Sequence, residues 1–118
     1  MNKIFEKLTN QLTETIDSSV ALALHNKNQE VEVIHLLWAL LTNTNSVLNQ
    51  LLNKMNVNKV AVELEAKSYA SKLPSVSSVT KENIKLSRNL SSSLQNAEGL
   101  MASFGDKFIA VDTWLISN

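Results

Sequence analysis

The sequence predicts a single all-α domain, and three observations support this prediction. The 118 residues include only two glycines and one proline, whereas a β-protein needs turn residues about every 8 to 12 positions. Hydrophobic residues make up 44% of the chain, enough for a folded core, and aromatic residues only 5%. Through the first helix, apolar residues recur at the four-residue spacing of one helix face, at Ile4, Leu8, Leu12, Ile16, Val20 and Leu24.

The first half of the chain is expected to hold four helices. The first spans residues 4–24 and the second residues 33–41, with a polar loop between them that includes His25. Ser46 and Asn58 are expected to cap a third and a fourth helix, because short polar side chains accept hydrogen bonds from a helix's first turn. The inner face of the third helix is expected to comprise Val47, Leu48, Leu51, Leu52 and Met55, and the fourth helix is expected to have partly buried positions at Val62, Leu64, Tyr69 and Leu73.

The second half is expected to hold a linker and two helices. Residues 74–79 are Ser-rich, contain the only proline and form the linker. A long fifth helix is capped by Thr80, runs to Phe104 and ends at residues 105–107. A sixth begins at Val111, with a carboxylate in its first turn, where it suits the helix dipole.

The two halves match one another at a fixed offset of 78 residues. Val31 meets Ile109 (109 − 31 = 78), and Leu37 meets Leu115 at the same offset. Because one register persists through helix, loop and next helix, we expect a pseudo-twofold repeat of a four-helix unit.

This repeat divides the chain, residues 1–118, into three parts. The first repeat is 1–73, the linker 74–79, and a partial second repeat 80–118. Asn118 stands opposite Leu40, so the second repeat is incomplete, and the chain is expected to be a fragment of a longer protein.

Charge and composition exclude several classes of protein. Eleven basic and eleven acidic residues give a net charge of zero, which argues against a nucleic-acid partner. The absence of cysteine excludes disulfides and favours a reducing compartment. No uncharged stretch is long enough for a signal peptide or a membrane span. A cytoplasmic protein with no membrane partner is expected.

Motifs for catalysis and metal binding are missing. Gly99 and Gly105 lie one residue too far apart for a phosphate-binding loop, and Asp106 stands where its lysine belongs. His25 and His35 are the only histidines, too few for a zinc site without cysteine. We therefore expect no catalytic residue, no metal and no cofactor in this chain.

Trp38 and Trp114 lie in the expected second and sixth helices. Each is compatible with core packing or with an aromatic anchor in an apolar groove that accepts unfolded chains.

Three segments together resemble the Clp amino-terminal repeat domain that precedes the ATPase rings of Hsp100 chaperones. They are residues 5–10 (FEKLTN), 31–41 (VEVIHLLWALL) and 105–112 (GDKFIAVD). The Phe-Ile pair after Gly-Asp is most similar to the ClpB disaggregase branch. The sequence departs from the family pattern in having Ile34 for an acidic residue, Val33 for proline, and Asp112-Thr113 for Glu-His. The family domain also continues for about two further helices.

The resemblance implies a substrate-recognition module of an ATP-dependent, homo-hexameric disaggregase that acts on unfolded or aggregated polypeptides. ATP and Mg²⁺ would bind the rings of the full-length protein, outside this chain. Substrate-handling positions carried over from the family are Thr9, Asp106 and Asp112. For the apolar groove, we expect Leu94, Leu100, Phe104 and Trp114.

Two other functions stay open. The domain could dock a folded adaptor, as an N-domain of a Clp protease ATPase subunit, or it could have a structural role that holds the ring or pairs neighbouring copies. The incomplete second repeat leaves Leu86, Leu90 and Leu115 without the helices that would cover them, so dimerisation or domain swapping of the fragment is also expected.

Overall fold

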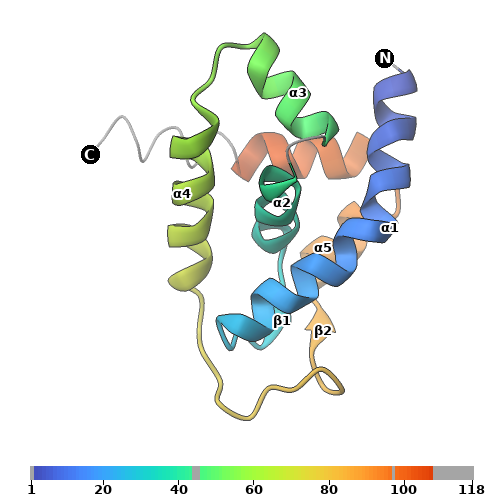
Figure 1. Ribbon diagram of the computed structural model, residues 1–118. Coiled ribbons are helices and arrows are strands. Elements are labelled where there is room, and N and C mark those ends of the chain that lie inside the picture. Colours follow the sequence, from blue (N-terminus) through green and yellow to red (C-terminus); the bar gives the residue numbers. More distant parts are fainter. Residues whose placement is uncertain (1, 44–45, 97, 108–118) are drawn as a thin grey trace.

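The regular elements in the described part of the computed structural model are six helical segments and two parallel strands of two residues each (Figure 1). The structure describes residues 2–43, 46–96 and 98–107. The elements are α1 (Asn2–His25), β1 (Glu30–Val31), α2 (Val33–Thr42), α3 (Val47–Lys54), α4 (Lys59–Ser71), β2 (Lys85–Leu86) and α5 (Arg88–Ser93). A last helical segment, residues 98–107, follows α5. The prediction of an all-α domain is confirmed.

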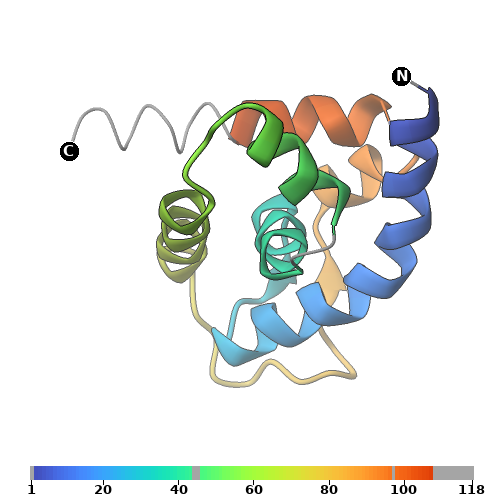
Figure 2. The ribbon, with the colours of Figure 1, turned by 45° about the horizontal axis from the view of Figure 1, so that its top comes forward.

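Helix α2 is the centre of the fold. Figure 2 shows it nearly end-on, with α1, α3, α4 and the second half of the chain around it. It packs mainly against α1 and α4, and every residue from Val33 to Leu41 is buried. A helix that is apolar on all sides is stable only inside a protein, which explains why the other elements surround this one.

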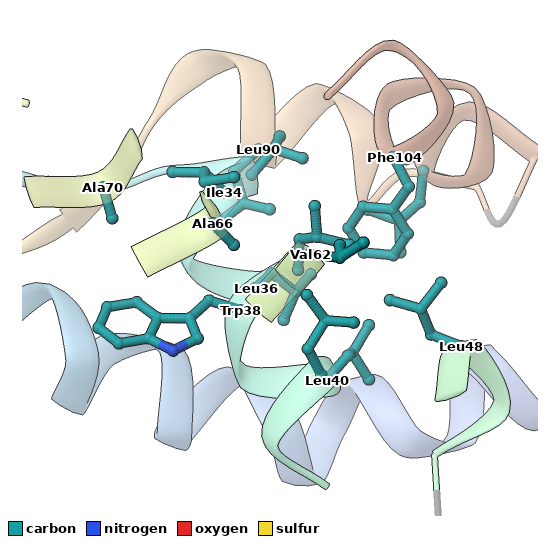
Figure 3. Packing of buried hydrophobic residues seen from close by; sticks show 14 of the residues in the cluster. Ile34, Leu36, Trp38, Leu40, Leu48, Val62, Ala66, Ala70, Leu90 and Phe104 are labelled. Atoms are coloured by element: carbon teal, nitrogen blue, oxygen red, sulfur yellow. The ribbon is translucent and has the colours of Figure 1, made fainter. Parts of the chain in front are cut away.

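The fourth helix covers α2 with small side chains. Val62, Ala66 and Ala70, spaced by four, are its buried residues, and they allow the two helices to approach closely. Of the residues expected to be partly buried in this helix, Leu64 is 59% exposed, so the prediction is wrong for it, and Tyr69 is 37% exposed. Trp38 lies in the core beside this contact and is 6% exposed (Figure 3). Core packing is therefore confirmed for Trp38, while Trp114 lies outside the described residues.

Side-chain caps begin α3 and α4 at the expected residues. The Ser46 hydroxyl accepts from the Asn49 N–H at 3.1 Å, and the Asn58 side chain accepts from the Ala61 N–H at 3.3 Å. With few glycines available, α1 and α3 are followed by Lys27 and Asn56 at φ of 57° and 56°. Both sit in the left-handed region, where a helix end is usually closed by glycine.

The long fifth helix expected from Thr80 to Phe104 is wrong. Residues 80–84 form turns because the Asn83 carboxamide accepts from the Thr80 N–H (2.7 Å) and donates to the Ser78 carbonyl (3.2 Å), a local alternative to helix. β2 follows and pairs with β1, Glu30 opposite Lys85. Helix α5 then starts at the Ser87 cap, whose hydroxyl accepts from Leu90 N–H at 3.0 Å, and the chain is non-helical again at 94–96.

Two further expectations change. Residues 105–107, expected to end the fifth helix, are themselves helical. Leu90, expected to be uncovered, is fully buried, and Leu86 is half-buried against the core. Those two leucines thus give no reason for the fragment to associate. Leu115 and the expected helix from Val111 lie outside the described residues.

Candidate functional site

An apolar pocket lies between α3 and helix 98–107, with α2 at its base. Its volume is about 260 Å³. Among the described residues that line it, none is charged or has a polar side chain: they are Leu37, Leu48, Leu51, Leu52, Met55, Met101, Phe104 and Gly105. Figure 3 shows Phe104 and Leu48 approaching the core from these two elements. Such a pocket suits an apolar ligand and offers nothing to a charged one.

A buried asparagine fixes the wall formed by α3. The Asn49 side chain is 3% exposed, and its amide group donates to the carbonyls of Leu40 (3.3 Å), Leu41 (3.0 Å) and Asn43. These carbonyls lie at the C-terminal end of α2, where no further helical turn supplies N–H donors to them. Asn49 therefore ties α3 to the end of α2.

The opposite wall, helix 98–107, is held at its end by α4. The Lys107 ammonium lies 5.0 Å from the centre of the Tyr69 ring and 3.5 Å from its hydroxyl. Phe104 is 3% exposed and reaches the core, whereas Met101 is half-buried. At the rim, a Cβ built on Gly105 would meet no atom within 4 Å, so no part of the chain that the structure describes covers this edge of the pocket.

The pocket has an exposed methionine at its mouth. Met55 caps the C-terminus of α3 and is 62% exposed. Its backbone N–H bonds the carbonyls of Leu51 (3.1 Å) and Leu52 (3.2 Å), so the backbone is fixed while the side chain faces solvent. Methionine is flexible and polarisable, which suits contact with ligands of varied shape.

A different kind of site, the junction of Asn28 and His35, lies where α2 begins. The Glu32 N–H donates to His35 Nδ1 at 2.8 Å, and His35 Nε2 lies 2.8 Å from Asn28 Oδ1. If Nδ1 accepts, the proton is on Nε2, which donates to Asn28. The Asn28 amide group in turn donates to the carbonyls of Pro74 (3.2 Å) and Leu73 (3.4 Å).

Burial lowers the pKa of His35 to about 4, so the ring is neutral near pH 7. Both ring nitrogens are occupied by protein partners, which leaves neither for a metal or a proton transfer. The role of His35 is structural, as expected from its place in the first turn of α2. His25 is the last residue of α1 and is exposed, not in the following loop as predicted.

A larger, more polar cleft lies along the 76–85 loop. It measures about 440 Å³ and is lined by Gln29, Glu30, Val76, Ser78, Val79, Asn83 and Lys85. Its ionisable side chains among the described residues are one carboxylate, Glu30, and one ammonium group, Lys85, and both are exposed to solvent. Among the described residues, no three His, Cys, Asp or Glu side chains gather as metal ligands would. We therefore take the apolar pocket as the candidate site.

The predicted groove residues are distributed differently from expectation. Phe104 lines the pocket, and Asp106 is exposed beside it. Leu94 is half-buried against the core, away from the pocket lining, and Leu100 is fully buried, with no surface left for a ligand. Thr9 lies in α1, but its side chain is not described; Asp112 and Trp114 lie outside the described residues.

Of the eight lining residues, sequence reasoning named only Phe104 for a binding site and missed the other seven: Leu51, Leu52, Met55, Leu48, Leu37, Met101 and Gly105. The amphipathic pattern of α3 placed the first three on its inner face. What the pattern could not show is that the rest of the described structure covers this face only in part. In the part of the chain that the structure describes, no helix has the length and apolar character of a membrane span.

Comparisons with known proteins identify the family. Residues 7–118 match the Clp repeat (R) N-terminal domain family. The chain is 60% identical over 114 residues to the chaperone protein ClpB of Wolinella succinogenes and 56% identical over 115 residues to that of Helicobacter hepaticus. It is 32% identical over 112 residues to ClpB of Propionibacterium freudenreichii. These matches cover 97%, 98% and 95% of this chain, which spans 13% of the length of each relative.

Proposed function

The chain belongs to the Clp repeat N-terminal domain family, and from this membership we propose that it binds exposed apolar segments of misfolded or aggregated proteins for a ClpB-type chaperone. The domain is a non-catalytic chaperone N-domain. The substrate role is supported by one observation above all: an uncharged apolar pocket with an exposed methionine at its mouth.

The geometry favours short apolar segments over large folded surfaces. A pocket of about 260 Å³ accommodates a few side chains. With no polar group in its lining, the pocket imposes no hydrogen-bond pattern on its ligand, and discrimination then depends on apolar area alone. This tolerance is what a chaperone needs when its substrates share only exposed apolar residues.

A titration with an unfolded polypeptide tests the proposal. Fluorescein-labelled casein is added to the 118-residue chain and binding is followed by fluorescence anisotropy. Leu51→Ser places a hydroxyl in the pocket wall, and we expect the affinity to fall by about fivefold, roughly 1 kcal/mol. The matched control is Leu64→Ser on the outer face of α4, away from the pocket lining, which should change the affinity by less than about twofold. Equal losses in both variants would contradict the pocket assignment.

Adaptor docking is the competing function. If a folded adaptor is the true partner, casein will not saturate the domain, and a folded partner will. The family positions Thr9, Asp106 and Asp112 remain proposed substrate-handling residues, and Leu94 and Trp114 remain proposed contacts that the pocket does not include.

The rest of the protein is also part of the proposal. We place this domain before the ATPase rings of a cytoplasmic homo-hexamer, with ATP and Mg²⁺ bound outside this chain. The reading frame after Asn118 tests this: two further helices and then two G-x-x-x-x-G-K-[ST] motifs are expected. Association of the isolated fragment stays a prediction, which sedimentation at rising concentration would measure.

A further inference from the structure

The two described methionines both line the apolar pocket, but they differ in accessibility. Met55 is 62% exposed at the mouth. Met101 is half-buried and packs against the core from helix 98–107. Because accessibility governs the oxidation of methionine by small oxidants, the structure separates a more accessible site, Met55, from a less accessible one, Met101.

We propose that Met55 is an oxidation site through which hydroperoxides weaken apolar binding at this pocket; the binding part of this inference rests on the proposed function. In the reaction the thioether sulfur attacks one peroxide oxygen. The S–O bond forms as the O–O bond breaks, and the proton of the attacked oxygen passes to the leaving oxygen, which departs as water from hydrogen peroxide or as an alcohol from an organic hydroperoxide. Sulfur is oxidised by two electrons and the peroxide is reduced.

The sulfoxide weakens binding because the pocket offers its new oxygen no partner. Every lining side chain is apolar, so an apolar ligand that covers Met55 would bury a polar S–O group without a hydrogen bond, which is unfavourable. In the free domain the same group faces water. The modification therefore acts on the bound state far more than on the fold.

The fold tolerates the change for a local reason. Met55 contributes to α3 through its backbone N–H, which bonds the Leu51 and Leu52 carbonyls, and oxidation leaves this group untouched. Oxidation of Met101 would instead place a polar group against the buried cluster. Methionine sulfoxide is restored by reductases that act on accessible side chains, so the exposure that permits oxidation of Met55 also permits its repair.

Hydrogen peroxide treatment of the 118-residue chain tests both parts. Peptide mapping by mass spectrometry should show sulfoxide at Met55 forming several times faster than at Met101. Labelled casein should then bind several-fold more weakly to the treated protein than to the untreated one, and methionine sulfoxide reductase treatment should restore the binding.

Two variants assign the effect to the residue. Met55→Leu removes the oxidisable sulfur, and Met101→Leu is its matched control. Each variant is compared with its own untreated sample, so a change in starting affinity does not enter. Peroxide should leave the affinity of Met55→Leu unchanged and still lower that of Met101→Leu.

The outcomes separate the two claims. Equal oxidation rates at the two methionines would contradict the claim that Met55 is the oxidation site, whatever the binding result. If peroxide lowers the affinity of Met55→Leu as much as that of the original chain, the claim that oxidation of Met55 weakens binding is contradicted. If untreated protein does not bind casein at all, the proposed function fails and the regulation fails with it, while the oxidation rates still decide whether Met55 is the modified residue.

Discussion

The start of α2 and the pocket between α3 and helix 98–107 differ in which side chains are buried and which remain exposed. At the Asn28–His35 junction, polar groups are buried and each ring nitrogen has a protein partner. At the pocket, apolar groups remain partly open, with Met55 62% exposed. One region is enclosed and satisfied, and the other has apolar surface still available.

This difference separates stability from binding. A buried hydrogen bond contributes to the fold only while both partners are present, and removing one partner leaves the other unsatisfied. An open apolar surface contributes little to the fold, but it gains free energy when a ligand covers it. We therefore expect changes at α2 to alter unfolding and changes at the pocket mouth to alter ligand affinity.

The largest expected effect is on the enclosed region. Leu40→Ala removes a fully buried side chain of α2 and should lower the free energy of unfolding by about 2–5 kcal/mol, as large-to-small changes in a core do. Urea unfolding followed by circular dichroism measures it. Leu64→Ala is the matched control, with an expected change of about 0.5 kcal/mol or less because the side chain is exposed. A small loss for Leu40→Ala would show that α2 is less enclosed than described.

The pH dependence of the junction comes next in size. The folded pKa of His35, about 4, lies below the unfolded value of 6.5, so the unfolded state binds the proton more readily. The contribution is full above pH 6.5 and is lost as pH falls toward 4, by up to about 1.4 kcal/mol per pH unit and about 3 kcal/mol in all.

Urea unfolding at a series of pH values measures this loss. His35→Gln removes the titrating group and should flatten the slope between pH 6.5 and 4 relative to the original chain. Parallel slopes in the two proteins would mean that His35 is not buried as a neutral ring.

The smallest expected effect tests the pocket rim. Gly105 lies in helix 98–107, is exposed, and has open space where a Cβ would stand. Alanine is favoured over glycine in a helix, so Gly105→Ala should stabilise the fold by about 0.5–1 kcal/mol. Thermal unfolding checks the sign. Destabilisation would indicate that the rim is occupied by part of the fold.

Sequence patterns predicted the first half of the chain well, because its elements depend on local signals. The period-four apolar residues of α1 and the Ser46 and Asn58 caps act within one or two turns of helix. The turns at 80–84 were missed because the Asn83 side chain competes with the helical hydrogen bonds, and the β1–β2 pair joins residues 55 positions apart (85 − 30). No local pattern reports such a contact.

The pocket shows the same limit. The apolar face of α3 could be predicted, but its openness depends on where helix 98–107 lies. The prediction for Leu64 was wrong in the opposite sense, because a residue expected to be buried is exposed. Leucine is usually buried, but the small side chains of Ala66 and Ala70 are the ones that α4 buries against α2.

The most direct test of the account is a methyl NMR titration of the 118-residue chain with unlabelled casein. We predict that the methyl signals of Met55, Met101 and Leu51 shift progressively with added casein, while those of Val60 and Leu64 on the outer face of α4 stay in place. The reverse pattern, with shifts on α4 and none at the pocket, would contradict the claim that this pocket binds apolar segments.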